Sequence, residues 1–243
     1  MKIIKRIALG LVLVVALIVI GFVAWAETPL GPAPEAITAL QSDANVTVTT
    51  DNFITFQPVN LKPSTGFIFY PGGRVDYRSY AAPLRAIAEQ GYLVVLVPVR
   101  LNLAFFDINA AEPVFEKYPE IKHWAVGGHS LGGVASALFA KDHPQVEGLV
   151  FWASYPADDS LKNSSLKMIS IYGTEDMAGM GKFDETKPFL TADAQYVVID
   201  GGNHAQFGDY GPQPGDNAAL ISRADQQAQV TQATSDFLKE LGK

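Results

Sequence analysis

The segment 128–132, Gly-His-Ser-Leu-Gly, constrains the fold of this chain more than any other feature. An apolar run at 124–128 precedes it, and a stretch rich in small residues follows from Leu131 to about Lys141. This order predicts a buried strand, a tight turn at Ser130 and then a helix, the arrangement of a nucleophile elbow. Glycine suits the turn because a Cβ would clash where the backbones approach each other. The helix start would also place unpaired N–H groups beside the serine, which favours binding of an oxyanion.

Apolar runs alternate with helical patterns along the rest of the chain, which predicts right-handed βαβ crossovers. We therefore expect an α/β fold in which helices flank a mostly parallel sheet. The first two runs lie on either side of Asp51-Asn52, as in a hairpin. The other strands are expected at 46–49, 53–56, 66–70, 92–99, 146–152, 167–172 and 195–200, and the other helices at 77–90, at 103–118 with an interruption near Pro113, and at 217–241.

The composition is that of a globular domain and excludes several classes of function. The 243 residues are 48% hydrophobic and 18% charged, which is enough to bury a sizeable core. The net charge is −7 and no basic stripe is present, so we expect no nucleic-acid partner. The chain has no cysteine, which excludes disulfides, thiolate metal sites and a cysteine nucleophile. We expect neither a cofactor nor a metal.

The segment 1–26 has a basic start and then an uncharged apolar run at 7–26. A helix of this length spans about 30 Å, the thickness of the hydrocarbon layer. Positive charge ahead of the run places the N-terminus in the cytoplasm and the remaining chain outside it. Ala24-Trp25-Ala26 resembles a signal-peptidase site, but the run is longer than a usual signal-peptide core. We predict a single-pass signal anchor; the alternatives are secretion after cleavage at Ala26 and a buried core helix. The basic residues ahead of the run are Lys2, Lys5 and Arg6.

A proline-rich stretch follows the apolar run. Pro29, Pro32 and Pro34 stiffen the chain and oppose a helix. We expect a linker at 27–44, which would hold the domain a short distance from the membrane. The α/β domain is then expected at 45–243.

A serine nucleophile needs a base, and the four histidines can be compared by position. His129 adjoins Ser130 on the turn, where neighbouring side chains diverge. His143 follows the next helix, and His123 begins the strand at its opposite end. Only His204 follows the carboxyl end of the last expected strand, where an open parallel sheet places its active site. We therefore expect His204 to be the base.

The base needs a carboxylate to orient it, and this carboxylate should follow the strand between Ser130 and His204. The strand expected at 167–172 is followed by Gly-Thr-Glu-Asp at 173–176. We expect Asp176 to orient the histidine. Glu175 is the alternative and Asp184 a more distant one.

An oxyanion hole needs two backbone N–H groups. One should come from Leu131, the residue after the nucleophile. The other should come from the loop 71–74, Pro-Gly-Gly-Arg, which follows the first fully apolar strand. We expect Gly73 to supply it, with Arg74 as the alternative.

From about residue 45 to residue 241 the chain resembles the serine α/β-hydrolases, because the order Ser130, Asp176, His204 is that of this superfamily. The elbow sequence is similar to those of lipases and esterases. Many members of this superfamily carry a helical cap between the strands expected here at 146–152 and 167–172. Residues 153–166 are too few for such a cap, so we expect an open site. The segments 203–208, Asn-His-Ala-Gln-Phe-Gly, and 70–73, Tyr-Pro-Gly-Gly, resemble small lidless enzymes related to dienelactone hydrolase. Those enzymes typically carry a cysteine nucleophile, so the serine here argues for ester hydrolysis rather than for a dienelactone substrate.

Two functions from different classes follow. The first is a serine hydrolase that acts on small-molecule carboxylic esters or thioesters through a Ser-His-Asp triad and an acyl-enzyme. The alternative is a non-catalytic binding protein of the same fold, held at the membrane. Such proteins usually lack a triad residue, and this sequence lacks none.

Overall fold

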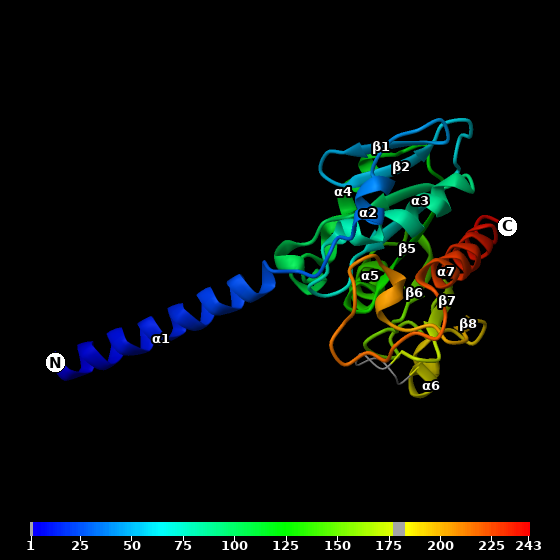
Figure 1. Cartoon of the computed structure of the whole chain (residues 1–243). Helices are drawn as coiled ribbons and strands as arrows, with labels where there is room; N and C mark the ends of the chain where they lie inside the picture. The colour runs from blue at the N-terminus through cyan, green and yellow to red at the C-terminus, as the bar shows by residue number, and fades with distance from the viewer. Residues whose placement is uncertain (1, 177–182) are drawn as a thin grey trace.

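An eight-stranded sheet forms the centre of the computed structural model, which describes residues 2–176 and 183–243 (Figure 1). The strand order is β1-β2-β4-β3-β5-β6-β7-β8. The hairpin β1–β2 joins β4 in antiparallel fashion, and all other neighbours are parallel. The α/β fold with a mostly parallel sheet is therefore confirmed. The strands are β1 (Val46–Thr50), β2 (Ile54–Pro58), β3 (Thr65–Tyr70), β4 (Leu93–Leu96), β5 (His123–His129), β6 (Val146–Trp152), β7 (Lys167–Gly173) and β8 (Gln195–Ile199).

Helices cover both faces of the sheet, because side chains of a buried strand alternate between its faces. On β3, Phe67 and Phe69 pack in one core cluster with residues of α3 and α7, whereas Ile68 and Tyr70 pack in a second cluster with residues of α4 and α5. The helices are α1 (Lys2–Ala26), α2 (Pro34–Ala39), α3 (Ala81–Glu89), α4 (Glu112–Lys117), α5 (Leu131–Asp142), α6 (Phe183–Thr186) and α7 (Arg223–Leu238).

The helix predicted over 103–118 is wrong for most of its length. The chain there forms short 3-10 turns, Ala104–Phe106 and Ile108–Ala111, before α4 begins next to Pro113. The buried hydroxyl of Tyr70 bonds the Ile108 carbonyl and the Ala111 amide, which draws this segment onto the sheet. The tertiary contact therefore overrides the local helical pattern.

The C-terminal helix is shorter than the predicted 217–241. It begins at Arg223, after Ser222, whose hydroxyl accepts a hydrogen bond from the Asp225 amide. The carbonyl of Asn217 instead accepts a hydrogen bond from the Asn203 side chain, and the chain ahead of α7 forms a loop.

Between β6 and β7, residues 153–166 form no helix or strand, as expected from the short spacing. In this part of the chain, all of which the structure describes, nothing covers the sheet as a cap domain would. The carboxyl ends of the central strands therefore carry the candidate site without an inserted domain.

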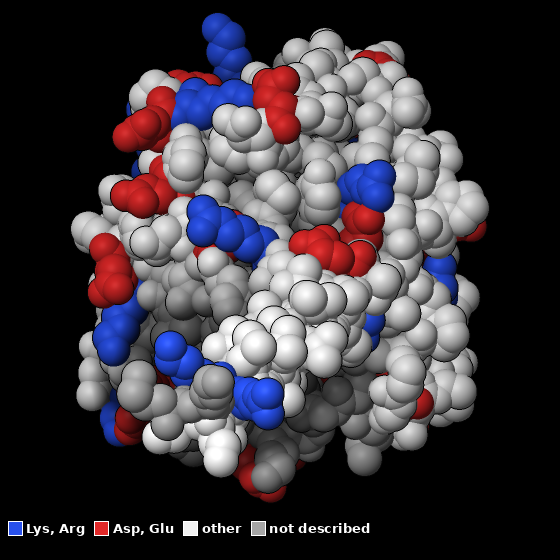
Figure 2. Space-filling model, turned by 90° about the vertical axis from the view of Figure 1, so that its left-hand side faces the viewer, with Lys and Arg blue, Asp and Glu red and all other residues white. Residues whose placement is uncertain are grey.

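The N-terminal helix α1 projects away from the rest of the molecule (Figure 1). Within Ile3–Ala26 a stretch of 18 residues has a mean hydropathy of 3.2, and the helix is long enough to span a membrane or to serve as a signal sequence. Figure 2 shows the face from which α1 projects, where acidic and basic residues are interspersed. Whether the helix anchors the chain stays a prediction.

The segment predicted as a linker, 27–44, contacts the α/β domain at several points. The Leu30 amide donates to the Arg74 carbonyl at 2.8 Å, and the Ala33 amide donates to the Asp209 carbonyl at 2.7 Å. The helix α2 begins at Pro34, whose fixed φ suits a first helical position, and it buries Ala36. The segment is thus held along the domain surface, while the predicted domain boundaries stay predictions.

Candidate active site

The turn after β5 holds Ser130 in a strained conformation, with φ of 51° and ψ of −119°. This region of φ is unfavourable for residues other than glycine and marks functional turns. The neighbouring glycines leave no room for a side chain. A Cβ on Gly128 would lie 2.4 Å from a backbone carbon of Gly132, and one on Gly132 would lie 2.3 Å from the carbonyl oxygen of Tyr70. The sequence predicted this strand–turn–helix arrangement.

His204 and Asp176 form a buried pair. The Nδ1 atom of His204 lies 2.9 Å and 3.0 Å from the two carboxylate oxygens of Asp176, and neither side chain is exposed. A carboxylate only accepts hydrogen bonds, so Nδ1 is the nitrogen that donates, which in a neutral imidazole leaves the lone pair on Nε2. This is the tautomer that a general base requires.

The other two candidate carboxylates lie elsewhere. Glu175 accepts a hydrogen bond from the Asn217 side chain at 3.3 Å. Asp184 has a side chain that is 86% exposed and pairs with Lys187. Of the three candidates, only Asp176 is joined to His204.

The loop that carries His204 is fixed by α7. The buried side chain of Gln226 accepts a hydrogen bond from the Asn203 amide at 3.0 Å and donates one to the Asn203 carbonyl at 2.7 Å. The close approach of the two loops requires glycine at 173, where a Cβ would lie 2.0 Å from the Gly202 carbonyl oxygen. These contacts set the position of His204, which directly follows Asn203.

No hydrogen bond joins Ser130 to His204 among the described residues, and the buried Nε2 atom of His204 is without a protein partner there. Hydrogen bonds of catalytic groups are often long in free enzymes and tighten when substrate binds. The residue before the serine provides the contact between the two parts of the site, since the rings of His129 and His204 have centroids 4.4 Å apart.

His129 is the residue that sequence reasoning missed. Its ring stacks on Phe207, and its Nδ1 atom lies 2.9 Å from the Tyr80 hydroxyl. Burial, together with the nearby His204, lowers the pKa of His129 well below its usual value of 6.5. His129 pairs in register with Trp152 of β6, which belongs to the same core cluster as Phe207. Because successive side chains of a strand point to opposite faces, the alternation along β5 could have predicted the face of the sheet on which His129 lies.

The remaining histidines lie away from the site, as expected. His123 is at the start of β5, where its Nδ1 is 3.0 Å from the Glu147 carboxylate. His143 ends α5 and donates a hydrogen bond from Nδ1 to the Phe139 carbonyl at 2.7 Å.

The loop after β3 offers one backbone amide to the site. The Gly72 amide donates to the Tyr80 hydroxyl at 3.0 Å, and the Arg74 amide donates to the Asn102 carbonyl at 2.7 Å. In the described chain the amide of Gly73, between them, donates no hydrogen bond. Gly73 also packs beside Leu131, because a Cβ on it would lie 3.0 Å from Leu131 Cδ2. This geometry favours Gly73 over Arg74 as the oxyanion donor.

Leu131 is the first residue of α5, and the first amides of a helix have no acceptor within the helix. The structure thus places two candidate N–H groups, on Gly73 and Leu131, on neighbouring segments. Within the described residues, no group of three or more His, Asp or Glu side chains is arranged to hold a metal ion.

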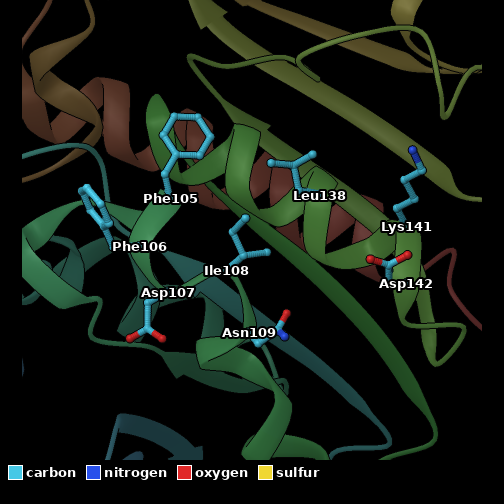
Figure 3. A pocket seen from close by; sticks show the side chains of 8 residues that line it. All are labelled: Phe105, Phe106, Asp107, Ile108, Asn109, Leu138, Lys141 and Asp142. Carbon is cyan, nitrogen blue, oxygen red and sulfur yellow. The ribbon is translucent and has the colours of Figure 1, made fainter.

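An open groove of about 660 Å³ lies between α5 and the segment 105–109 (Figure 3). The predicted site residues are not part of its lining, which therefore belongs to a different part of the surface. The side chains that line it are Phe105, Phe106, Asp107, Ile108, Asn109, Leu138, Lys141 and Asp142.

Comparisons with known proteins agree with this architecture. A sequence model described as "Alpha/beta hydrolase family" matches residues 66–228. The fold is similar to the crystal structure of the esterase domain of a Rhodothermus marinus protein, with a TM-score of 0.59 and 14% sequence identity. That match covers 82% of this chain and 99% of the other. A search of curated proteins gave no match.

Proposed function

Because the chain belongs to the alpha/beta hydrolase family, we propose that it is a serine hydrolase that cleaves carboxylic esters or thioesters. The observation that carries this proposal is the buried hydrogen bond between Asp176 and His204, in the loops after β7 and β8. Ser130 follows β5 in the same sheet, so all three residues come after the carboxyl ends of parallel strands. Ligands of open α/β sheets bind at this edge.

In the proposed reaction, the hydroxyl oxygen of Ser130 attacks the carbonyl carbon of the ester while its proton passes to Nε2 of His204. The amides of Gly73 and Leu131 bind the negative carbonyl oxygen. His204 returns the proton to the leaving alcohol as the carbon–oxygen bond breaks, which leaves an acyl group on Ser130. Water then attacks the acyl-enzyme, with His204 as base, and releases the acid. Asp176 keeps the imidazole oriented throughout.

Labelling with a fluorophosphonate tests the proposal, because only an activated serine reacts. We expect the full chain to be labelled and to hydrolyse p-nitrophenyl acetate. Ser130→Ala should abolish labelling and lower turnover on the order of 10⁴-fold, with the thermal midpoint nearly unchanged.

The exposed Ser160 supplies a matched control, since Ser160→Ala removes a hydroxyl outside the site and should leave labelling intact. An unlabelled, inactive wild-type chain would instead support a non-catalytic binding protein. A Ser130→Ala variant with a tenth of the wild-type turnover would show that another residue is the nucleophile.

We also propose that α1 holds the hydrolase domain at the outer side of a membrane. The support is the apolar run at 7–26, which is exposed as far as Trp25, and the basic residues ahead of it. A carbonate wash should leave the full chain in the membrane fraction, and protease added to spheroplasts should digest the domain. Soluble enzyme that begins at Glu27 would indicate secretion, whereas protection from protease would contradict an external domain.

A further inference from the structure

The side chain of Arg74 joins the loop beside Gly73 to the end of α1. Its Nε donates to the Trp25 carbonyl at 2.9 Å, and its Nη2 donates to the Thr28 carbonyl at 2.8 Å. The guanidinium also lies 4.2 Å from the centre of the Trp25 ring. One side chain therefore binds two backbone carbonyls at the point where the apolar helix ends.

The backbone of Arg74 is fixed as firmly as its side chain. Its φ of +55° lies in the left-handed region, which a residue with a Cβ rarely occupies unless other contacts hold it. Its amide donates to the Asn102 carbonyl, and its carbonyl accepts from the Leu30 amide. The conformation of the residue next to Gly73 thus depends on contacts with two other segments.

Asn102 provides a second connection to the helix end. Its side-chain amide donates to the Ala26 carbonyl at 3.0 Å, and its own φ is +51°. Ala26 itself is fully buried. Asn102 therefore holds Ala26 with its side chain and Arg74 with its carbonyl.

The location of Arg74 makes these contacts relevant to the site. Gly72 is tied to the Tyr80 hydroxyl on one side of Gly73, and Arg74 is tied to α1 and Asn102 on the other. An oxyanion donor stabilises the transition state only when it is held in place before the reaction. Movement of Arg74 would move the adjoining Gly73, while the histidine pair has its own supports in α7.

We propose that residues 25–28, the last two of α1 and the two that follow, support the active site, with Arg74 and Asn102 as positioning residues for the Gly73 amide. The inference rests on the proposed function, in which Gly73 is an oxyanion donor. It assigns to the apolar helix a role in turnover in addition to any role in targeting. Arginine is required because the N–H groups of its planar guanidinium donate to the Trp25 and Thr28 carbonyls in fixed directions. The ammonium of lysine is a single point charge and does not fix two such directions.

The test compares Arg74→Lys with the wild type in the full chain in detergent, with p-nitrophenyl acetate as substrate. Loss of a transition-state contact lowers kcat and leaves KM nearly unchanged. We expect kcat to fall on the order of 10-fold, less than the loss for complete removal of an oxyanion donor. Trp25→Leu removes the ring and keeps the carbonyl, and should lower kcat by about 2- to 5-fold.

Arg78→Lys is the matched control, because Arg78 is close in sequence but pairs with Asp76 and not with α1. It should keep the wild-type kcat. An Arg74→Lys variant with unchanged kcat, or one in which only KM or the thermal midpoint changes, would overturn the inference and leave the proposed function standing. A wild type without esterase activity would overturn both.

Discussion

The histidine side of the candidate site and its oxyanion side are held by different parts of the molecule. On the histidine side, the supports are buried side chains within the α/β domain, chiefly Asp176 and Gln226. On the oxyanion side, the supports come from Tyr80 and from the partly exposed contacts of Arg74 with the end of α1. Among the described residues, the contacts with the end of the N-terminal helix are all on the second side.

The difference indicates how each side responds to change. When one partner of a buried pair such as Asp176 and His204 is altered, the other is left in the interior without compensation, which is costly. A backbone amide such as that of Gly73 cannot be removed by a side-chain substitution and is disturbed only through its neighbours. We therefore expect large losses on the histidine side and graded losses on the oxyanion side.

The largest effect should come from Asp176→Asn. An amide in place of the carboxylate favours the wrong tautomer of His204, and turnover should fall on the order of 10⁴-fold. Glu175→Gln is the control, because Glu175 bonds Asn217 rather than the histidine. Steady-state kinetics with p-nitrophenyl acetate measure both. A greater loss in Glu175→Gln than in Asp176→Asn would mean that Glu175, and not Asp176, orients the histidine.

A smaller effect is expected for Tyr80→Phe, which alters the residue that touches both sides. The fully buried Tyr80 hydroxyl bonds the Gly72 amide and His129 Nδ1, so its removal leaves two buried polar groups unpaired. The free energy of unfolding should fall by about 2 kcal/mol, measured by urea denaturation.

The control for this variant is Tyr77→Phe, on the same 3-10 turn but not fully buried, and it should be nearly neutral. Equal effects of the two substitutions would argue against Tyr80 as a link between the sides.

The smallest effect concerns the acid dependence of stability. In the unfolded chain His129 takes up a proton below about pH 6.5, but burial and the nearby His204 lower its pKa in the folded protein. The unfolded state then binds more protons, so this contribution is fully present above pH 6.5 and is lost as the pH falls.

His129→Gln should therefore flatten the pH dependence of the unfolding free energy below pH 6.5, by up to about 1.4 kcal/mol per pH unit. The comparison uses slopes rather than absolute stabilities, because the substitution also changes the contact with Tyr80. Identical slopes for the variant and the wild type would show that His129 is protonated in the folded protein.

Much of the fold follows from local pattern. Continuous apolar runs predicted the parallel strands, and the glycines at 128 and 132 predicted the turn at Ser130, because each signal acts through neighbouring residues. The approach of Asp176 to His204 also follows from sequence, since both come after the carboxyl ends of parallel strands. Their catalytic roles stay predictions.

The parts that sequence did not predict depend on distant contacts. The helix expected over 103–118 gives way to 3-10 turns because the segment is bonded to Tyr70. The contacts of Arg74 with Trp25 and Thr28 join residues far apart in sequence, and no local pattern encodes them. The turn predicts that the side chains of His129 and Ser130 diverge, but the ring of His129 nevertheless contacts that of His204.

The burial of Ala26 has a consequence for the order of events during biogenesis. A protease that cut after Ala26 would need the bond between Ala26 and Glu27 in an extended, accessible form. In the folded protein Ala26 is fully buried and its carbonyl is bonded to Asn102. Processing and folding would then compete in time: a chain that folds first shields the bond, and a chain that is cut first folds without Trp25 and Ala26.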